Sequence, residues 1–254
     1  MTRAFIDSIR KNGLKTLPRE IVKFILSKLN LVVLKKTTFN ELETTQEKLN
    51  EFYARNSSAI FHIGANEGEE RFFYGTLNKP VFWFEASVET FSRLKGNLAL
   101  EKNQHLFNIC LSDANGSQDF YMASNQGQSS SLITPVLNHV HNKLISYRKT
   151  VIETKRFDSI FNVNEIPDRS HLVLDVQGSE LKVLIGIGKL LQNFHSIYCE
   201  VTSGNSPYLN APDFSTIRNF LDGFGFKIII EPLDRKSTRL NSSHEWISRM
   251  PSSA

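Results

Sequence analysis

The 254-residue chain has only two cysteines, a formal net charge of only +4 and no long apolar run. Cys110 and Cys199 each lie in an apolar stretch, which predicts two buried free thiols and argues against a disulfide framework. The longest apolar run, residues 24–34, is interrupted by Lys28 and is shorter than the roughly 20 residues that a spanning helix needs. We therefore expect a cytoplasmic protein without a signal peptide or a membrane span.

The small net charge is distributed unevenly along the chain. Residues 1–36 carry nine Lys or Arg and two acidic residues, a local charge of +7. Residues 234–254 hold four basic and two acidic residues, so that residues 37–233 carry −5. A balance this small gives no support for a nucleic-acid partner. The basic segment, with helices expected at 3–12 and 18–29, either packs against the main body or contacts an anionic membrane surface.

The last part of the chain, residues 234–254, has neither helical nor strand periodicity. It resembles an in-frame translation of a common sequencing-library adapter, and we interpret it as a non-native tail. This interpretation predicts that the native C-terminal residues are missing. The strand expected at residues 226–230 would then lie at an exposed edge of its sheet.

Between these two segments, apolar runs alternate with helical patterns, and the 40% hydrophobic content is enough for a full core. This alternation predicts an α/β fold with an open, doubly wound, mostly parallel sheet, preceded by a short helical extension. Ser87 is the expected cap of a helix whose Val88, Phe91, Leu94 and Leu98 face the sheet. We expect main strands at 60–63, 81–84, 105–111, 171–175, 196–201 and 226–230, and helices at 71–77, 88–98, 181–191 and 214–222.

The most informative stretch is the apolar run Ile60–Ile63, which leads into a turn that begins at Gly64. A second apolar run, residues 81–84, stops at Glu85 about 20 residues further on. Open α/β sheets hold nucleosides in this way, because the turn admits the ligand and the carboxylate accepts the ribose hydroxyls. The pattern therefore predicts a nucleoside-containing cofactor.

The spacing of the turn indicates which cofactor is bound. A dinucleotide fingerprint needs glycine at its first, third and sixth positions, where this chain has Gly64, Asn66 and Glu69. Glu69 lies close to Glu67 and Glu70, and this cluster of acids would repel a diphosphate. A ligand that carries a sulfonium and an ammonium group would tolerate them. The charge pattern favours S-adenosylmethionine.

Four sequence blocks, in a fixed order, carry a resemblance to a known family. They are residues 62–68 (HIGANEG), 84–86 (FEA), 111–116 (LSDANG) and 174–180 (LDVQGSE). Over residues 59–233 the chain resembles the FkbM-type S-adenosylmethionine-dependent methyltransferases, which implies a class I, Rossmann-like fold. The family usually has Asp where this chain has His62. We accordingly divide the chain into a basic helical extension (1–55), a C-terminally truncated methyltransferase domain (56–233) and the tail (234–254).

The expected cofactor-binding residues lie in the glycine turn and where strands end. The resemblance implies that Asp113 contacts adenine, although a role in forming the turn competes with this one. Glu85 follows four large apolar residues, and a carboxylate there is costly unless it is paired with hydrogen-bond donors. The expected set is Gly64, Asn66, Gly68, Glu85, Ala86, Ser112, Asp113 and Asp175.

Asp175 is the strongest candidate for catalysis, with Glu180 and Glu200 as further candidates, because Asp175 leaves a buried strand where a transferable methyl group should lie. A hydroxyl acceptor must lose its proton, either to Asp175 or with the help of a divalent metal held by Asp175 and Glu200. Glu180 alternatively interacts only with the dipole of its helix. Gln177 and Tyr208 are candidates for orienting the acceptor.

The sequence Asp175–Gly178 (DVQG) lacks the two prolines and the aromatic residue expected in an enzyme that methylates base amino groups. An oxygen acceptor is therefore favoured, and the family resemblance implies a hydroxyl of a sugar, glycan or natural product. The expected activity is O-methyl transfer to a small-molecule or glycan acceptor. Two alternatives stay open: a catalytically silent nucleoside-binding module, and an oxidoreductase or epimerase that uses a dinucleotide.

Overall fold

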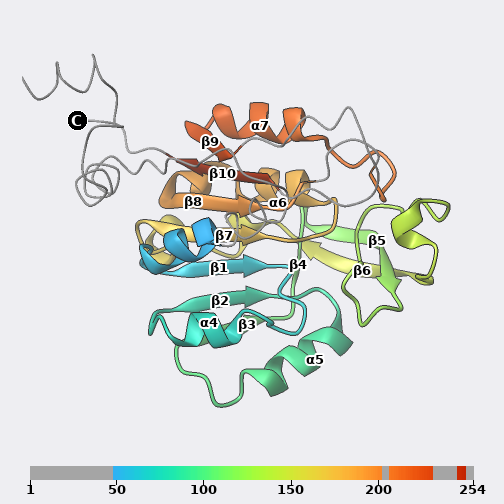
Figure 1. Ribbon diagram of the computed structural model, residues 1–254, viewed down its shortest axis with the longest axis horizontal. Helices are drawn as coiled ribbons and strands as arrows, with labels where there is room; N and C mark the ends of the chain where they lie inside the picture. Colours follow the sequence, from blue (N-terminus) through green and yellow to red (C-terminus); the bar gives the residue numbers. More distant parts are fainter. Residues whose placement is uncertain (1–47, 202–205, 231–244, 250–254) are drawn as a thin grey trace, which may run out of the picture. The chain divides into compact units, whose positions relative to one another are not determined.

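The computed structural model describes residues 48–201, 206–230 and 245–249 (Figure 1). Its central sheet has seven strands in the order β3-β2-β1-β7-β8-β10-β9. All neighbours from β3 to β8 are parallel, whereas β10 runs antiparallel to β8 and β9. This confirms the predicted open, mostly parallel α/β sheet. The strands are β1 (Ile60–Ile63), β2 (Val81–Phe84), β3 (Gln104–Phe107), β7 (Ser170–Leu174), β8 (Phe194–Cys199), β9 (Phe226–Ile230) and β10 (Glu245–Arg249).

Hydrophobic cores lie on both faces of the sheet, because successive side chains of a strand point to opposite faces. Phe61 and Ile63 of β1 belong to a core with α6 (Glu180–Ile187) and α7 (Phe214–Asp222). Ile60 belongs to another core, with residues of α4 (Arg71–Gly75) and α5 (Val88–Asn97). The helix at residues 48–55 contributes Ala54 to this second core. The sheet is therefore buried on both sides, as a doubly wound fold requires.

The helix α5 begins as the sequence predicts, since the side chain of Ser87 accepts a hydrogen bond from the backbone N–H of Thr90. Leu94 and Leu98 are buried, also as predicted. The prediction for Val88 is wrong, because this side chain is 64% exposed. Val88 is the first residue of α5, directly after the cap, and lies off the face that Leu94 buries.

The strand predicted at 105–111 is divided between two sheets. After β3 the side chain of Asn108 donates to the backbone carbonyl of Glu85, and the chain leaves the central sheet there. A second sheet, of order β4-β6-β5, follows (Figure 1). In it, β6 pairs in parallel with β4 and antiparallel with β5. Its strands are β4 (Cys110–Leu111), β5 (Gly116–Ala123) and β6 (Tyr147–Lys155).

Several short 3₁₀ helices complete the described structure. One of them continues α6, so the helix predicted at 181–191 is a short α-helix followed by a 3₁₀ turn. Gly188, with φ +56°, separates the two parts. The 3₁₀ helices are Val140–Asn142, Phe157–Ser159, Val163–Glu165 and Gly188–Asn193.

One strand lies in the segment that we interpret as a tail. Glu245–Arg249 forms β10 between β8 and β9, although the sequence shows no strand periodicity there. The expected edge position of β9 is confirmed, because β9 is the last strand of the described sheet and pairs with β10 on one side. The backbone of β10 provides the pairing, and this does not require an alternating sequence. The adapter origin of residues 234–254 stays a prediction.

The basic segment at residues 1–36, with its two predicted helices, lies outside the described residues. Its proposed contact with an anionic membrane accordingly stays a prediction. Among the residues that the structure describes, no helix is long and apolar enough to cross a membrane.

Candidate functional site

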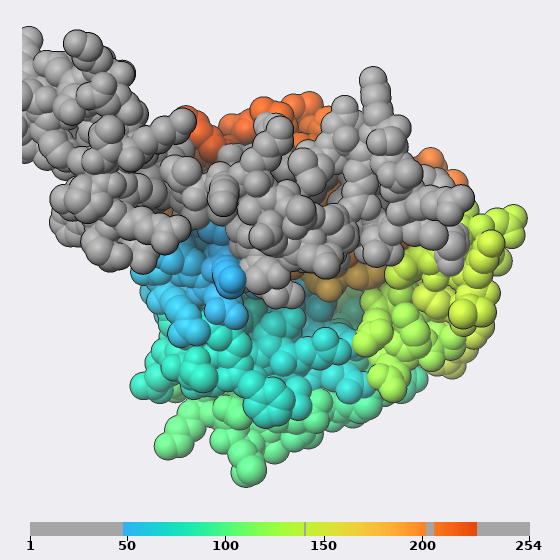
Figure 2. Space-filling view, in the orientation of Figure 1, coloured from blue at the N-terminus to red at the C-terminus, as the bar shows by residue number. Residues whose placement is uncertain are grey.

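A cavity of about 820 Å³ lies where the parallel strands of the central sheet end. The residues that follow β1, β2, β7 and β8 form one side, and residues 109–111 with the loop after β5 form another. In Figure 2, yellow-green residues of the second sheet and its loops adjoin the teal residues near β1 and β2. The carboxyl ends of parallel strands are where α/β sheets bind ligands.

Gly64 brings the ends of β1 and β7 together. Its φ is +85°, and a Cβ atom there would lie 1.8 Å from the backbone carbonyl oxygen of Asp175. The backbone N–H groups of Gly64 and Ala65 both donate to the carbonyl of Phe84. Glycine is thus required here for the close approach of two strand ends, and this requirement does not depend on a bound ligand.

Glu85 is 9% exposed and lines the cavity. Its Oε2 accepts the backbone N–H of Asn66 at 3.0 Å, and its Oε1 accepts that of Ser87 at 2.8 Å. Burial raises the pKa of Glu85 to about 7, although these two hydrogen bonds favour the charged form. Each oxygen keeps further capacity to accept a hydrogen bond from a ligand.

Asn66, next to Glu85 in the cavity lining, has a buried side-chain oxygen without a hydrogen-bond partner. Among the buried side-chain nitrogen and oxygen atoms of the described residues, its Oδ1 is the one that lacks a hydrogen-bond partner. Asn66 also lines the cavity, with a left-handed φ of +45°. Because a buried carbonyl oxygen without a donor is costly, this atom calls for a donor such as a hydroxyl or ammonium group.

Asp175 follows β7 directly and lines the cavity, as predicted. Its side chain is held by Gln177, a residue expected from the sequence to orient the acceptor. The side-chain amide of Gln177 donates from Nε2 to Asp175 Oδ1 at 2.6 Å. The Tyr208 hydroxyl lies 2.8 Å from Gln177 Oε1, to which it donates. Burial and the nearby Glu200 raise the pKa of Asp175 well above its usual value, while the Gln177 hydrogen bond acts in the opposite direction.

Glu180 and Glu200 line the same cavity, so the three predicted catalytic acids lie in one place. Glu180, in the first turn of α6, accepts the backbone N–H groups of Gly178 at 3.0 Å and Val176 at 3.3 Å. Burial raises the pKa of Glu180 to about 7. Glu200 shares a side-chain hydrogen bond with Asp175. Two neighbouring carboxyl groups that share a hydrogen bond hold one proton between them.

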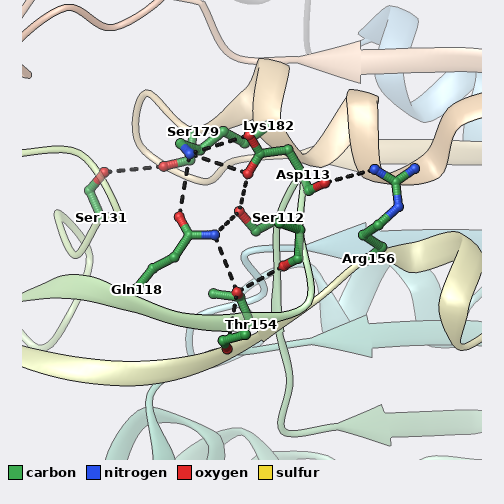
Figure 3. A network of polar contacts seen from close by, with 10 residues as sticks. Ser112, Asp113, Gln118, Ser131, Thr154, Arg156, Ser179 and Lys182 are labelled. Atoms are coloured by element: carbon green, nitrogen blue, oxygen red, sulfur yellow. Dashed lines mark hydrogen bonds and ion pairs between the residues drawn. The ribbon is translucent and has the colours of Figure 1, made fainter.

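Asp113 and Ser112 do not line the cavity. The Lys182 ammonium group lies 3.2 Å from Asp113 Oδ1, and the Ser112 hydroxyl donates to the same oxygen at 2.9 Å (Figure 3). Burial acts to raise the pKa of Asp113, but these hydrogen bonds and the charge of Lys182 outweigh it, and the pKa lies below its usual value. Asp113 thus joins the second sheet to α6, and its predicted contact with adenine stays a prediction.

Two other predicted residues have different positions. Ala86 lines the cavity beside Glu85. Gly68 does not, and a Cβ atom there would lie 2.7 Å from Leu94, so the absence of a side chain serves core packing. His62, where the family usually has Asp, lines the cavity, stacks on Trp83 with ring centroids 5.3 Å apart and has its pKa lowered by burial.

The polar loop after β5, residues 126–131, is predicted from the sequence to be a mobile loop that covers the acceptor. Serine, asparagine and glutamine side chains between residues 125 and 131 line the cavity. Ser131 donates to the backbone carbonyl of Gln177 at 2.7 Å, which ties this loop to the end of β7. The sequence shows a polar, glycine-containing loop between two strands. The position of this loop beside β7, however, depends on the packing of the second sheet.

The cavity lining contains many acidic side chains and no Lys or Arg among the described residues. The nearby Lys182 is paired with Asp113, and Arg93 lies 2.6 Å from Glu67. Within the described part of the chain, no group of three or more His, Cys, Asp or Glu is arranged to hold a metal ion. The lining carboxyl groups are those of Glu69, Glu70, Glu85, Asp175, Glu180 and Glu200.

A comparison with protein families classifies the chain. The model of the methyltransferase FkbM domain matches residues 62–228, from the end of β1 into β9. The chain belongs to the FkbM methyltransferase family. The matched segment includes all the residues that we expected in the site, from Gly64 to Glu200.

Two curated relatives of this FkbM domain are methyltransferases by name. The 2-O-methyltransferase NoeI of Sinorhizobium fredii is 26% identical over 150 residues, which cover 56% of this chain and 62% of the relative. The hexuronic acid methyltransferase AglP of Haloferax volcanii is 26% identical over 154 residues, 61% of this chain and 60% of the relative. The chain thus spans about three-fifths of the length of these relatives.

Among solved structures, an rRNA methylase from Streptococcus thermophilus is 11% identical and superposes with a TM-score of 0.46. The superposition covers 87% of this chain and 100% of that one. A likeness at this score supports no statement about function.

Proposed function

We propose that this FkbM domain is an S-adenosylmethionine-dependent O-methyltransferase that acts on a hydroxyl group of a neutral sugar or glycan. The observation that carries this proposal is the cavity at the strand ends, with six lining carboxyl groups and no Lys or Arg among its described residues. A diphosphate would be repelled there, whereas a sulfonium and an ammonium group are attracted. Membership of the family and the names of the two relatives support the same reaction class.

The residues present fit this cofactor. Glu85, whose carboxylate is fixed by two backbone N–H groups, would accept the ribose hydroxyls. Asn66 Oδ1, buried and without a donor, would accept a hydroxyl or ammonium hydrogen of the same ligand. The apolar Ile109 and Leu111 on the opposite wall would contact the base. When bound, S-adenosylmethionine supplies a methyl group that is already activated by a sulfonium.

The protein then has to align the acceptor and remove a proton. Asp175 would accept the proton of the acceptor hydroxyl, whose oxygen would take the methyl group from S-adenosylmethionine, and S-adenosylhomocysteine would be the co-product that leaves. Correct alignment contributes up to about 7–11 kcal/mol to catalysis, so the walls of the cavity matter as much as the base. Glu200 shares a side-chain hydrogen bond with Asp175. A divalent metal held by these two acids is the alternative means of activating the hydroxyl.

The acceptor side of the cavity favours an uncharged sugar. Its wall consists of hydroxyl and amide side chains such as Asn125, Gln128 and Ser130, which match sugar hydroxyls as donors and acceptors. A sugar carboxylate or phosphate would meet acids without a Lys or Arg partner among the described residues, and an unpaired charge in such a site is costly. His139 and His141 are the remaining side chains on this wall that can carry positive charge.

The proposal is tested by calorimetry and by a matched panel of acceptors. We expect S-adenosylmethionine and S-adenosylhomocysteine to bind and nicotinamide dinucleotides not to bind. Methyl glycosides of neutral sugars are then compared with glucuronides, and glucuronamides serve as uncharged analogues of the glucuronides. Release of S-adenosylhomocysteine should occur with neutral acceptors, and methylation of the glucuronide in preference to its amide would contradict the choice of a neutral acceptor. Cofactor binding without turnover on any acceptor would indicate the silent module instead.

A further inference from the structure

A residue between Asp175 and the start of α6 has an unusual backbone conformation. Gln177 has φ +54°, a region that non-glycine residues rarely adopt, and Gly178 follows with φ +93°. Strained residues of this kind persist only where their surroundings hold them. The holding contact is the hydroxyl of Ser131, 1% exposed, which donates to the Gln177 carbonyl at 2.7 Å. Figure 3 shows Ser131 and Ser179 facing each other beside this turn, with their hydroxyl oxygens 3.4 Å apart.

This backbone conformation places the Gln177 side chain between Asp175 and Tyr208. Gln177 Nε2 lies 2.6 Å from Asp175 Oδ1, and Gln177 Oε1 lies 2.8 Å from the Tyr208 hydroxyl. Tyr208 is 3% exposed, so its hydroxyl is fixed by protein groups. The amide is thus held at both ends, between a buried hydroxyl and a carboxyl group.

The direction of the hydrogen bonds follows from the atoms around Tyr208. Its hydroxyl lies near two carbonyl oxygens, that of the Ser129 backbone at 3.1 Å and that of the Gln177 side chain. Neither oxygen has a hydrogen to give, so the hydroxyl donates. The Gln177 amide has its Nε2–H on the side of Asp175, and a donor in this position stabilises the charged form of a carboxyl group. Successive bonds of this kind strengthen one another.

We propose that Gln177 and Tyr208 are positioning residues that hold the carboxylate of Asp175 charged and oriented toward the acceptor hydroxyl. This inference rests on the proposed O-methyl transfer. Gln177 and Tyr208 exchange no proton, because the hydroxyl proton of the acceptor passes to Asp175 alone. The role differs from the one expected from the sequence, in which these two residues contact the acceptor.

Several ionisable groups face Asp175 from the neighbouring elements. Glu200 follows β8 and Glu180 begins α6, and both disfavour a negative charge on Asp175. Tyr208 comes from the segment after residue 205, with Tyr147 of β6 next to it. Within the Asp175–Glu200 pair, the donor from Gln177 reaches Asp175. This donor acts against burial and Glu200 and favours the charged form of Asp175.

The inference can be tested without knowing the acceptor. Carbon-13 NMR of the side-chain carboxyl groups is recorded against pH on the full chain, and the Asp175 signal is assigned by its loss in Asp175→Asn. We expect Tyr208→Phe to raise the pKa of Asp175 by about 0.5–1 unit, the amount that one hydrogen bond supplies. Gln177→Met removes the N–H donor without adding a charge and should raise this pKa further. Tyr121→Phe is the matched control, because the Tyr121 hydroxyl accepts a hydrogen bond from Thr134 and does not line the cavity.

Kinetics with a neutral acceptor provide the second measurement. Tyr208→Phe should lower kcat about tenfold at pH 7 with an unchanged KM, and the loss should shrink as the pH rises. An unshifted Asp175 pKa in both variants would overturn the inference, as would a raised KM with normal kcat, which would indicate contact with the acceptor. Failure of the unmodified protein to bind S-adenosylmethionine would refute the proposed function instead, and the NMR titration would still decide the positioning role.

Discussion

The backbone carbonyl of Asp175 occupies the space where any side chain of residue 64 would lie, since a Cβ atom on Gly64 would come within 1.8 Å of it. With φ +85° at Gly64, substitution by alanine adds backbone strain to this collision. We expect Gly64→Ala to lower the free energy of unfolding by about 2–3 kcal/mol or more, as measured by urea denaturation.

The matched control for this substitution is Gly96→Ala. Gly96 lies in α5, and a Cβ atom added there would have nothing within 4 Å of it. Alanine is a better helix former than glycine, so this variant should be more stable by about 0.5–1 kcal/mol. Equal effects of the two substitutions would show that the contact with Asp175 is not what requires glycine at position 64.

Replacement of Glu85 by alanine should abolish cofactor binding. Two hydrogen bonds from ribose hydroxyls to a carboxylate are each worth about 1.5–3 kcal/mol, so the affinity for S-adenosylmethionine should fall at least 100-fold in calorimetry. Glu153→Ala is the control, because Glu153 lies exposed on β6 and forms an ion pair with Lys155. Unchanged affinity in the Glu85 variant would count decisively against the proposed cofactor site.

Cofactor affinity should also depend on pH through Glu85. Its pKa is raised to about 7 by burial, so the carboxyl group is largely protonated at pH 5 and charged at pH 8. Because the charged form accepts both ribose hydroxyls, affinity should rise from pH 5 to pH 8 and then level off, with proton release on binding. Calorimetry in buffers of different ionisation enthalpy measures that release. Glu85→Gln should bind weakly at every pH and lose this dependence.

Asp175→Asn separates binding from chemistry. The variant keeps the shape of the side chain but cannot accept the proton, so kcat should fall by about 10²–10⁴ while S-adenosylmethionine still binds. Methyl transfer from a labelled cofactor measures the first effect, and calorimetry measures the second. Asp119→Asn, at an exposed position on β5 next to Lys149, should leave both unchanged. Full turnover in the Asp175 variant would remove this residue from the mechanism.

Glu180 makes the folded protein sensitive to pH. Burial raises its pKa to about 7 from an ordinary 4.5, so between these values it stays protonated in the folded chain and is ionised in the unfolded chain. Its contribution to stability is therefore fully present below pH 4.5 and is lost as the pH rises to 7, by up to about 3 kcal/mol. Glu180→Gln should be more stable than the unmodified protein at pH 8 and similar at pH 4.5. Urea denaturation at the two pH values tests this, and a constant difference would disprove it.

Much of the fold follows from local patterns. The helix Phe214–Asp222 has the predicted bounds, since the Asp213 side chain caps it by accepting a hydrogen bond from the backbone N–H of Thr216, and Gly223 follows its end. The strands Ile60–Ile63 and Val81–Phe84 likewise match their apolar runs. Caps and apolar periodicity act over a few neighbouring residues, so they can be recognised without knowledge of the packing.

Other features depend on partners that are distant in the sequence. Asp113 is paired with Lys182, 69 residues further along the chain, and the strand expected at 105–111 divides because Cys110–Leu111 finds its partner in β6. Val88 lies next to a correctly predicted cap and is still exposed. No local pattern distinguishes these outcomes from their alternatives.

The amino-acid sequence by itself determined most of the strands and helices of the main sheet, the glycine turn after β1 and the candidate acids at the strand ends, because each depends on residues close together in the chain. Only the tertiary structure decided that Asp113 pairs with Lys182 outside the cavity lining and that Gln177 and Tyr208 hold Asp175. It also brought Asp175 and Glu200 close enough to share a hydrogen bond. The physical reason is that hydrogen-bond partners and burial, which set the charge of each acid, are created by packing between segments far apart in sequence.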